Sequence, residues 1–335
     1  MGDRTGRTAR APRRPRASGA TGERIFCACA PGLEELLRDE LADLGLSART
    51  LPGGAEAEGT EAAALACLAS RLSDAVLLRL WEGPGAELGA AKRAAARQAG
   101  GLPLLVRVAG DAATISVDAA GAPLFRRGWR ARVGAAPLRE TLAAGLLRAG
   151  GWRGDRPFCD PMCGSGTIAI EAALSAARRA PGLDRPLALE ALPGRGARVA
   201  RLREALRAGE RGVPVPVVAS DRNAGALRLA RKNAAAAGVE GAIRFERCDA
   251  AQAPLPAGGP GLCAVNPPYG LRLEEGAAEA WRALGALTAR LAGWDLLALG
   301  PDRGLERLLP LRPAATWPVQ NGGLTCRIYC YTQLP

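Results

Sequence analysis

Residues 158–167 read Phe-Cys-Asp-Pro-Met-Cys-Gly-Ser-Gly-Thr, and this stretch decides the fold. It begins with a short apolar run that is typical of a buried strand, and a helical pattern follows from Thr167. Gly164 and Gly166 let the backbone between them turn sharply and approach a ligand without a Cβ in the way. The start of the helix then offers free N–H groups to an anion. The stretch predicts a ligand-binding loop made by Asp160, Met162, Cys163, Gly164, Ser165, Gly166 and Thr167.

The loop belongs to a longer stretch in which strand and helix patterns alternate. Strand and helix patterns alternate from Arg156 onward, which predicts a parallel sheet with helices on both faces. In such sheets, ligands bind at the carboxyl ends of the strands. We expect strands at 158–160, 215–221, 242–249, 261–266, 296–299, 313–319 and 325–331, and helices from 167, over 224–237 and over 277–292.

Two further aspartates end strands of this predicted sheet. At the end of the second strand, Asp221 can accept hydrogen bonds from both hydroxyls of a ribose, and Asp249 after the third strand can accept from an adenine amino group. Aspartate also favours turns after strands, so one of them alone carries little weight. Together with Asp160 they predict a cradle for adenosine and an amino acid. We place their neighbours Arg222 and Ala250 in the same site.

The motif Asn266-Pro267-Pro268-Tyr269 follows the next apolar strand and is the predicted catalytic motif. Its two prolines remove two backbone donors and stiffen the chain. The Asn266 side-chain oxygen and the Pro267 carbonyl are then fixed acceptors for an –NH2 group, whose lone pair can be aimed at an electrophilic methyl group. The Tyr269 ring offers a surface for stacking an extruded base, worth ~1–3 kcal/mol. A merely structural proline-rich turn is the weaker interpretation.

Composition narrows the classes of function. A formal net charge of +12 favours a polyanionic partner such as nucleic acid, although arginine-rich codon usage alone would also raise the charge. The nine cysteines show no disulfide-like framework, and the chain holds no histidine. This excludes a His-containing metal site or catalytic triad, and we expect no metal. No apolar run reaches the ~18–20 residues of a membrane span and no signal-peptide core follows the basic N-terminus, so we expect a cytoplasmic protein.

The chain before the loop divides into three expected regions. Residues 1–22 form a flexible basic arm, which has the composition of an RNA-binding arm or of an unimportant tail. Residues 23–118 predict an α+β domain and residues 119–153 a bridge, which lead into a domain over residues 154–335. In the α+β domain we expect strands at 24–29, 74–81, 103–108 and 113–118, separated by Ala-rich helical stretches, and a helix with Leu33, Leu36, Leu37, Leu41 and Leu44 on one face.

The bridge carries four arginines around two aromatic rings and ends in a helix predicted over 137–147. Such a cluster can grip phosphates and stack on bases. It can equally form a packing corner between domains, with solvated charges. The sequence leaves both interpretations open. The first assigns RNA contacts to Arg126, Arg127, Trp129, Arg130 and Arg132.

Asp160–Thr167, Asp221, Asp249 and Asn266–Tyr269 resemble the motifs of class I methyltransferases that act on exocyclic amines. More closely, the chain resembles the THUMP-domain RNA guanine-N2 methyltransferases, the type that modifies bacterial 23S rRNA. The N-terminal region is shorter than the usual THUMP-bearing module, and the chain has one catalytic region where relatives often have two. Further matching stretches are 30–37, 126–130, 136–140, 167–173 and 321–324.

The resemblance implies an α/β fold, with a Rossmann-like class I methyltransferase sheet behind an N-terminal α+β, THUMP/ferredoxin-like RNA-binding domain. It implies S-adenosyl-L-methionine as the cofactor, bound by the loop, by the two strand-end aspartates with their neighbours, and by Asn266. The partner is RNA, with rRNA favoured over tRNA. The expected reaction is direct methyl transfer to N2 of a guanine flipped out of structured RNA.

Other classes of protein use parts of the same pattern. A tRNA guanine-N2 methyltransferase, an N6-adenine nucleic-acid methyltransferase or a glutamine-side-chain methyltransferase can share the Asn-Pro-Pro-Tyr motif, but the last two do not explain the bridge or the N-terminal domain. A cytosine-C5 RNA methyltransferase needs a cysteine nucleophile beside the base, whereas Cys263 lies inside a predicted strand. The non-enzymatic alternative is an RNA-binding protein with an inactive fold, against which the intact motifs argue. The oligomeric state stays open.

Overall fold

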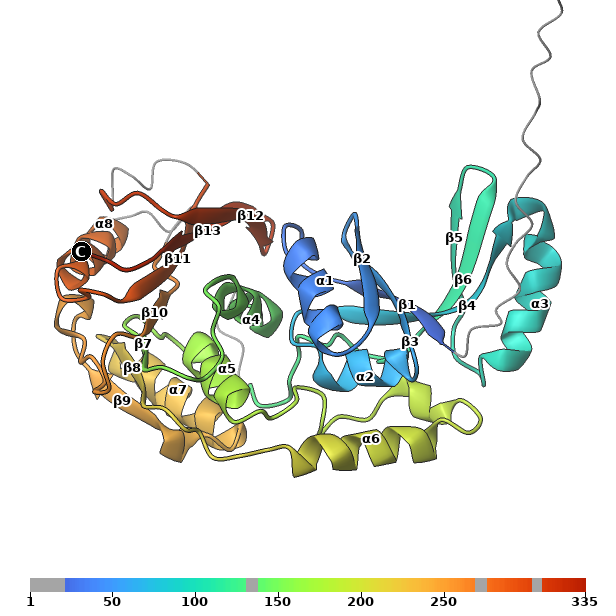
Figure 1. The fold of residues 1–335 in the computed structure, drawn as a ribbon, viewed down its shortest axis with the longest axis horizontal. Coiled ribbons are helices and arrows are strands. Elements are labelled where there is room, and N and C mark those ends of the chain that lie inside the picture. Colours follow the sequence, from blue (N-terminus) through green and yellow to red (C-terminus); the bar gives the residue numbers. More distant parts are fainter. Residues whose placement is uncertain (1–21, 131–137, 269–275, 303–308) are drawn as a thin grey trace, which may run out of the picture.

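The computed structural model describes residues 22–130, 138–268, 276–302 and 309–335. These residues form two sheets that lie side by side, the N-terminal sheet in blue to teal and the C-terminal sheet in green to red in Figure 1. Among the sequence-based predictions, those for Tyr269, Arg132 and the arm over 1–21 lie outside the described residues.

The N-terminal domain is a six-stranded antiparallel sheet in the order β2-β3-β1-β4-β6-β5. Ile25 and Cys27 on the central strand are fully buried, as are Leu37 and Leu41 on α1, so strand and helix share one core. Its strands are β1 (Glu23–Ala28), β2 (Ser47–Leu51), β3 (Gly54–Gly59), β4 (Ala75–Pro84), β5 (Leu105–Ala109) and β6 (Ala112–Asp118), and its helices are α1 (Glu34–Asp43), α2 (Ala62–Ala69) and α3 (Leu88–Gln98).

The hairpin β2–β3 corrects the prediction of an Ala-rich helical stretch in this part of the chain. Alanine favours a helix locally, but Ala55 and Ala57 alternate with glutamates along β3 and are buried against the core. At the hairpin, Gly53 has a φ of +80°, and a Cβ on Gly54 would lie 2.0 Å from the Cys27 carbonyl oxygen. Tertiary packing therefore overrides the local propensity.

The C-terminal domain is a seven-stranded sheet in the order β12-β13-β11-β10-β7-β8-β9. The five strands from β11 to β9 are parallel, and the chain reverses its direction of travel across the sheet between β7 and β10. The expected α/β methyltransferase-type sheet is confirmed in this half. Its strands are β7 (Phe158–Asp160), β8 (Val217–Asp221), β9 (Ile243–Arg247), β10 (Leu262–Val265), β11 (Asp295–Pro301), β12 (Ala315–Asn321) and β13 (Leu324–Tyr331).

The last two strands correct the prediction of a purely parallel sheet, because β13 runs antiparallel to both β11 and β12. The β12–β13 connection is a two-residue turn in which Gly322 and Gly323 have φ of +58° and +87°. A turn with two positive φ angles matches the twist of a tight antiparallel hairpin.

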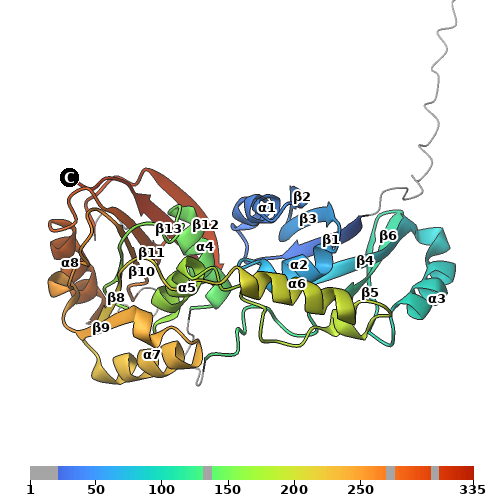
Figure 2. The ribbon, with the colours of Figure 1, turned by 60° about the horizontal axis from the view of Figure 1, so that its bottom comes forward.

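Helices cover both faces of the C-terminal sheet (Figures 1 and 2). These helices are α4 (Glu140–Ala149), α5 (Thr167–Ala176), α7 (Ala224–Ala236) and α8 (Gly276–Thr288), and the remaining helix of this half is α6 (Gly196–Ala208). Helix α6 is missing from the sequence-based prediction, because it has four arginines and only three large apolar residues to mark a periodic face. It lies away from the sheet, alongside α2 of the N-terminal domain (Figure 2). In the described residues, no helix is both long and apolar enough to span a membrane.

A buried ionic network joins the two domains. Glu171 on α5 is fully buried, and its carboxylate meets Arg71 of the N-terminal domain at 3.2 Å and Arg127 of the bridge at 3.4 Å. The Arg71 guanidinium also donates to the carbonyls of Leu174 and Arg179. Arg127 in turn donates to the Arg71 carbonyl at 2.5 Å. Each charge at this junction is therefore compensated by contacts from another segment.

We expect Glu171→Gln to lower the free energy of unfolding by about 3–5 kcal/mol, because it leaves two largely buried guanidinium groups without their counter-charge. Urea denaturation measures the change. Glu246→Gln is the control, since Glu246 pairs with Arg244 on the surface at 2.8 Å, where ion pairs contribute little. Equal, small effects of both variants would contradict the structural importance of the network.

Candidate functional site

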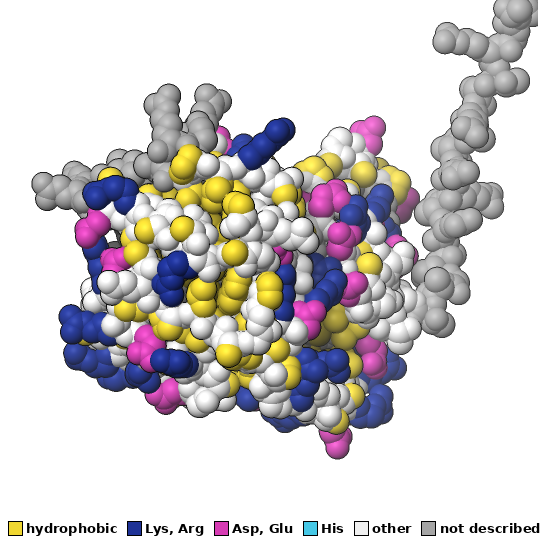
Figure 3. Space-filling view, turned by 60° about the vertical axis from the view of Figure 1, so that its left-hand side comes forward, with side chains coloured by type: hydrophobic (Ala, Val, Ile, Leu, Met, Phe, Trp, Pro, Cys, Tyr) yellow, Lys and Arg dark blue, Asp and Glu magenta, His cyan; other side chains and the backbone are white. Residues whose placement is uncertain are grey.

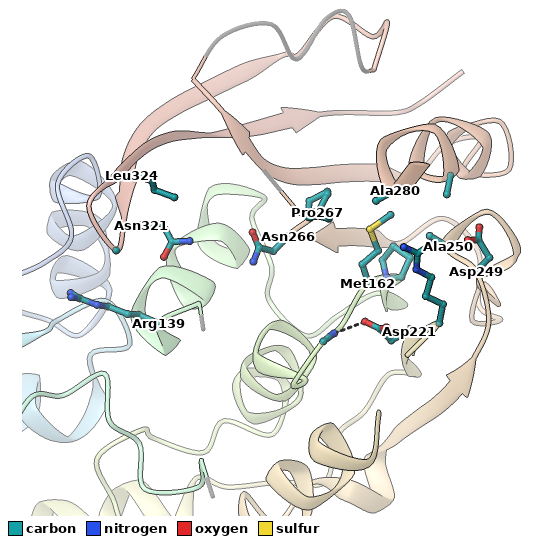
Figure 4. Close-up of a pocket in the computed structure, with 16 residues that line it drawn as sticks. Arg139, Met162, Asp221, Asp249, Ala250, Asn266, Pro267, Ala280, Asn321 and Leu324 are labelled. Carbon is teal, nitrogen blue, oxygen red and sulfur yellow. Dashed lines mark hydrogen bonds between the residues drawn. The ribbon is translucent and has the colours of Figure 1, made fainter. Parts of the chain in front are cut away.

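A cavity of about 640 Å³ opens at the carboxyl ends of the parallel strands, beside the switch between β7 and β10. This is where open α/β sheets bind ligands. Its walls come from the loop after β7, the ends of β8, β9 and β10, helix α8, the β12–β13 turn and Arg139 before α4. Figure 4 shows the labelled side chains around it.

Two glycines with positive φ angles shape the loop after β7. Gly164 and Gly166 have φ of +53° and +85°, which other residues rarely adopt. The Gly164 N–H donates to the Asp221 carboxylate at 2.9 Å, the dashed line in Figure 4. Met162 and Gly164 line the cavity, as predicted for a ligand-facing loop.

The other predicted loop residues do not line the cavity. The Cys163 N–H donates to the Ser220 carbonyl, and the Ser165 carbonyl accepts from the Asn233 side chain at 3.0 Å. The Thr167 hydroxyl accepts from Arg130 at 3.0 Å. A Cβ on Gly166 would lie 3.1 Å from Ala230 on α7, so this glycine permits close packing of the loop. These contacts hold the loop in place.

Asp221 and Asp249 both line the cavity, together with their neighbours Arg222 and Ala250. The two Asp221 oxygens accept the N–H groups of Gly164 and Asn223, at 2.9 and 2.8 Å, which fixes the carboxylate in one orientation. Asp249 accepts the Ala251 N–H at 2.9 Å. Each carboxylate oxygen has a second lone pair. Both aspartates can therefore still accept hydrogen bonds from a ligand.

Asp160 lies below the loop instead of lining the cavity. It is 1% exposed, and within the described part of the chain neither carboxylate oxygen has a donor in good hydrogen-bonding geometry. Burial raises the pKa of this carboxyl well above its usual range, and the Asp221 carboxylate adds to the effect, while the nearby amides of Met162 and Ala169 oppose it. A buried acceptor with no partner is costly. Asp160 therefore has the properties of a functional rather than a stabilising residue.

At the end of β10, the catalytic motif presents a second unpaired acceptor. Among the described residues, the buried Asn266 Oδ1 atom has no hydrogen-bond partner, and Asn266, Pro267 and Pro268 all line the cavity. The Pro268 carbonyl accepts the Trp281 indole N–H at 3.1 Å, which ties the motif to the fully buried Trp281 on α8. The acceptor proposed from sequence is thus held in place and remains uncommitted.

The sequence analysis missed several residues of the cavity wall. Arg139 and Asn321 lie at the opposite end of the cavity from Asp221 in Figure 4, with Asn266 between the two ends. The stretch 321–324 matches the family in sequence, and it includes Asn321, Gly322 and Leu324 of the cavity wall. Its residue types formed no pattern that indicates a chemical role. Ala280 and Ala283 line the cavity one helical turn apart, a spacing that marks no function by itself.

The bridge arginines correct the RNA-contact interpretation. Trp129 is 5% exposed, Arg127 is committed to Glu171, and Arg130 pairs with Glu140 at 3.0 Å and donates to the Leu138 carbonyl. Of the described members of this cluster, Arg126 is the exposed one. Internal pairing makes this stretch the packing corner that the sequence left open as an alternative.

The residues of the cavity fit S-adenosylmethionine. Two fixed carboxylates suit the ribose hydroxyls and the adenine amino group, and the glycine loop leaves room for close approach by an amino-acid portion. The unpaired buried carboxylate of Asp160 suits a cationic amino group. The chain's own acceptors therefore suit the nucleoside and the amino group of the cofactor expected from sequence.

Comparison with known proteins agrees with this geometry. Residues 127–329 match the family described as the RMKL-like methyltransferase domain, and residues 24–77 match the RlmL ferredoxin-like domain. A ribosomal RNA large subunit methyltransferase K/L from Alcanivorax borkumensis is 35% identical over 91% of this chain and 52% of its own length. The chain spans between 33% and 58% of the length of the curated relatives it matches.

Two solved structures share the whole fold. SMU.472, solved in complex with SAH, is 24% identical with a TM-score of 0.82, and the likeness covers 94% of this chain and 99% of that one. A Listeria monocytogenes protein named as a predicted N6-adenine-specific DNA methylase is 26% identical, with a TM-score of 0.81 over 92% and 96% of the two chains. The fold and the N-terminal ferredoxin-like domain are thereby confirmed. The family match covers more than half of the sequence, and the chain belongs to the RMKL-like methyltransferase domain family.

Proposed function

We propose that this chain transfers a methyl group from S-adenosylmethionine to the exocyclic N2 amine of guanine in structured RNA, with large-subunit ribosomal RNA as the substrate. With that substrate, the place of action is the cytoplasm. The observation that carries the proposal is the unpaired Asn266 Oδ1 atom, an acceptor for an amine N–H inside the cavity whose other end is the aspartate cradle.

The cofactor supplies an electrophilic methyl group on a sulfonium sulfur. Asp221 and Asp249 orient its nucleoside end, and the loop at Met162 and Gly164 borders the rest. Asn266 accepts an N–H of the target amine, which turns the nitrogen lone pair out of conjugation with the ring and toward the methyl group. The amine becomes acidic as it is methylated, so no strong general base is required.

The cavity walls can also select and hold an extruded base. Pro267 and Pro268 form a stiff edge beside Asn266, held by the Trp281 hydrogen bond. The stacking role predicted for Tyr269, which lies outside the described residues, is part of this proposal. Excluding water around the amine strengthens its hydrogen bond to Asn266, because the local dielectric constant falls. The proposed chemistry thus uses orientation and hydrogen bonding, which a chain without histidine can provide.

The relatives support RNA as the polymer. The matched large-subunit methyltransferases are named for ribosomal RNA, and the N-terminal domain matches a domain of such proteins. Figure 3 shows hydrophobic side chains across the middle of one face, with Lys and Arg gathered along its lower rim. The second candidate is an N6-adenine nucleic-acid methyltransferase, favoured by the name of the Listeria structure. The two differ in product, N2-methylguanosine against N6-methyladenosine.

Asp221→Ala should weaken S-adenosylmethionine binding roughly tenfold or more, because it removes a charged acceptor for the ribose. Isothermal titration calorimetry gives the dissociation constant. Asp184→Ala is the control, since Asp184 is 60% exposed and does not line this cavity. Wild-type protein that bound NAD as tightly as S-adenosylmethionine would contradict the assignment of the cradle.

Asn266→Ala should lower the single-turnover methylation rate by ~10²-fold or more, the scale observed when an oriented polar group is deleted from an active site. Cofactor affinity should change little, because the cradle is built elsewhere. Asn266→Asp keeps an acceptor oxygen and should retain more activity than the alanine variant. The substrate is unmodified ribosomal RNA, with products identified by mass spectrometry. A wild-type rate in Asn266→Ala would rule out the acceptor role.

The stability of the unliganded protein should depend on pH through Asp160. Its pKa is raised in the folded state, so the unfolded chain releases this proton first and stability falls as pH rises above the ordinary value of 3.8 toward the raised one. Asp160→Asn cannot titrate. Thermal unfolding between pH 5 and 8 should therefore show the wild type losing stability relative to Asp160→Asn as pH increases. Parallel curves for the two proteins would mean that this carboxyl does not titrate abnormally.

A further inference from the structure

Arg139 lies at the outer end of the cavity, on the side of the N-terminal domain. It immediately precedes α4 and lines the cavity, and in Figure 4 its guanidinium extends away from Asn266. The side chain remains 48% exposed. None of the chemistry described above uses this residue.

The Arg139 side chain is oriented but not neutralised. Its guanidinium carbon lies 4.8 Å from the centroid of the Phe125 ring in the bridge, so one face of the group is stacked. Its ion-pair partner, Asp74 of the N-terminal domain, is 3.6 Å away, and the Asp74 carboxylate already accepts the Thr141 hydroxyl at 2.6 Å. The guanidinium therefore has a set direction and retains most of its five N–H donors for another acceptor.

The charges of the cavity differ between its two ends. Asp221 and Asp249 occupy the cofactor end, and Arg222 beside them pairs with Glu279 at 2.9 Å. Within the described part of the cavity wall, Arg139 is the one cation at the other end. An anion at the mouth is therefore favoured next to Arg139 and disfavoured next to the aspartates.

We propose that Arg139 binds a backbone phosphate of the RNA strand beside the flipped nucleotide. This inference rests on the proposed function, in which the base lies at Asn266. A nucleotide flipped into a pocket leaves its phosphates at the mouth. A planar, stacked guanidinium matches the geometry of phosphate oxygens. Asp74 of the N-terminal domain and Phe125 of the bridge orient Arg139. The packing of the two domains therefore sets the position in which Arg139 meets the RNA.

The test compares Arg139→Ala with Arg139→Lys in the full chain, using unmodified large-subunit ribosomal RNA made by transcription. Arg139→Ala should raise the RNA dissociation constant roughly tenfold at moderate salt. The slope of log K against log salt should become shallower by about 0.7–0.9, the contribution of one phosphate. Arg139→Lys keeps the charge and should keep the slope, with a smaller loss of affinity. KM for RNA should rise while kcat changes little.

Arg153→Ala is the matched control, because Arg153 is an exposed arginine with an aspartate, Asp43, at 3.5 Å, and it lies beyond the other end of α4. It removes the same charge and should leave the salt slope unchanged. Equal slopes for wild type, Arg139→Ala and Arg153→Ala would overturn the inference, as would weakened cofactor binding in both Arg139 variants. Wild-type protein that forms no N2-methylguanosine in this RNA would instead refute the proposed function.

Discussion

The arrangement of the molecule depends on one buried carboxylate. Glu171 lies inside the protein on α5, and its two arginine partners come from the N-terminal domain and from the bridge. A carboxylate removed from water is costly unless it is paired and hydrogen-bonded, so the fold that contains Glu171 must also bring Arg71 and Arg127 to it. The two domains therefore cannot separate without exposing or stranding these charges.

This constraint reaches the cavity because α5 begins at the glycine loop. Arg130, three residues after Arg127, donates to the Thr167 hydroxyl at the start of α5 and pairs with Glu140 at the start of α4. The same arginine therefore links the end of the cofactor loop to the segment that carries Arg139. Bridge residues that seemed suited to RNA instead fix the loop and the mouth of the cavity relative to each other.

In and below the cavity, the fold leaves two polar groups unsatisfied. Within the described residues, the Asp160 carboxylate and the Asn266 amide oxygen are buried without hydrogen-bond partners, although most buried polar groups in proteins are paired. Asp160 is the last residue of the buried strand β7, and Asn266 directly follows the buried strand β10. A protein tolerates such costs where a ligand provides the missing partner, and both groups lie at the ends of strands that border the proposed cofactor and amine positions.

The sequence by itself determined the parallel part of the C-terminal sheet and the chemistry at its strand ends. Alternating apolar patterns predicted β7, β8 and β9 in order. The Gly164–Gly166 turn, Asp221, Asp249 and Asn266 could be assigned a chemical role from their neighbours in the sequence.

Tertiary contacts decided the rest. The β2–β3 hairpin overrode the helix propensity of alanine, because its small side chains pack under α1 and α2. The bridge arginines pair with carboxylates that are distant in sequence. Arg127 pairs with Glu171, 44 residues away along the chain, and Arg130 pairs with Glu140, 10 residues away. The place of Arg139 at the mouth depended on Asp74, a residue of the other domain. Local sequence patterns indicate which chemistry a side chain offers. Its partners are residues distant in sequence, and only the folded chain brings them together.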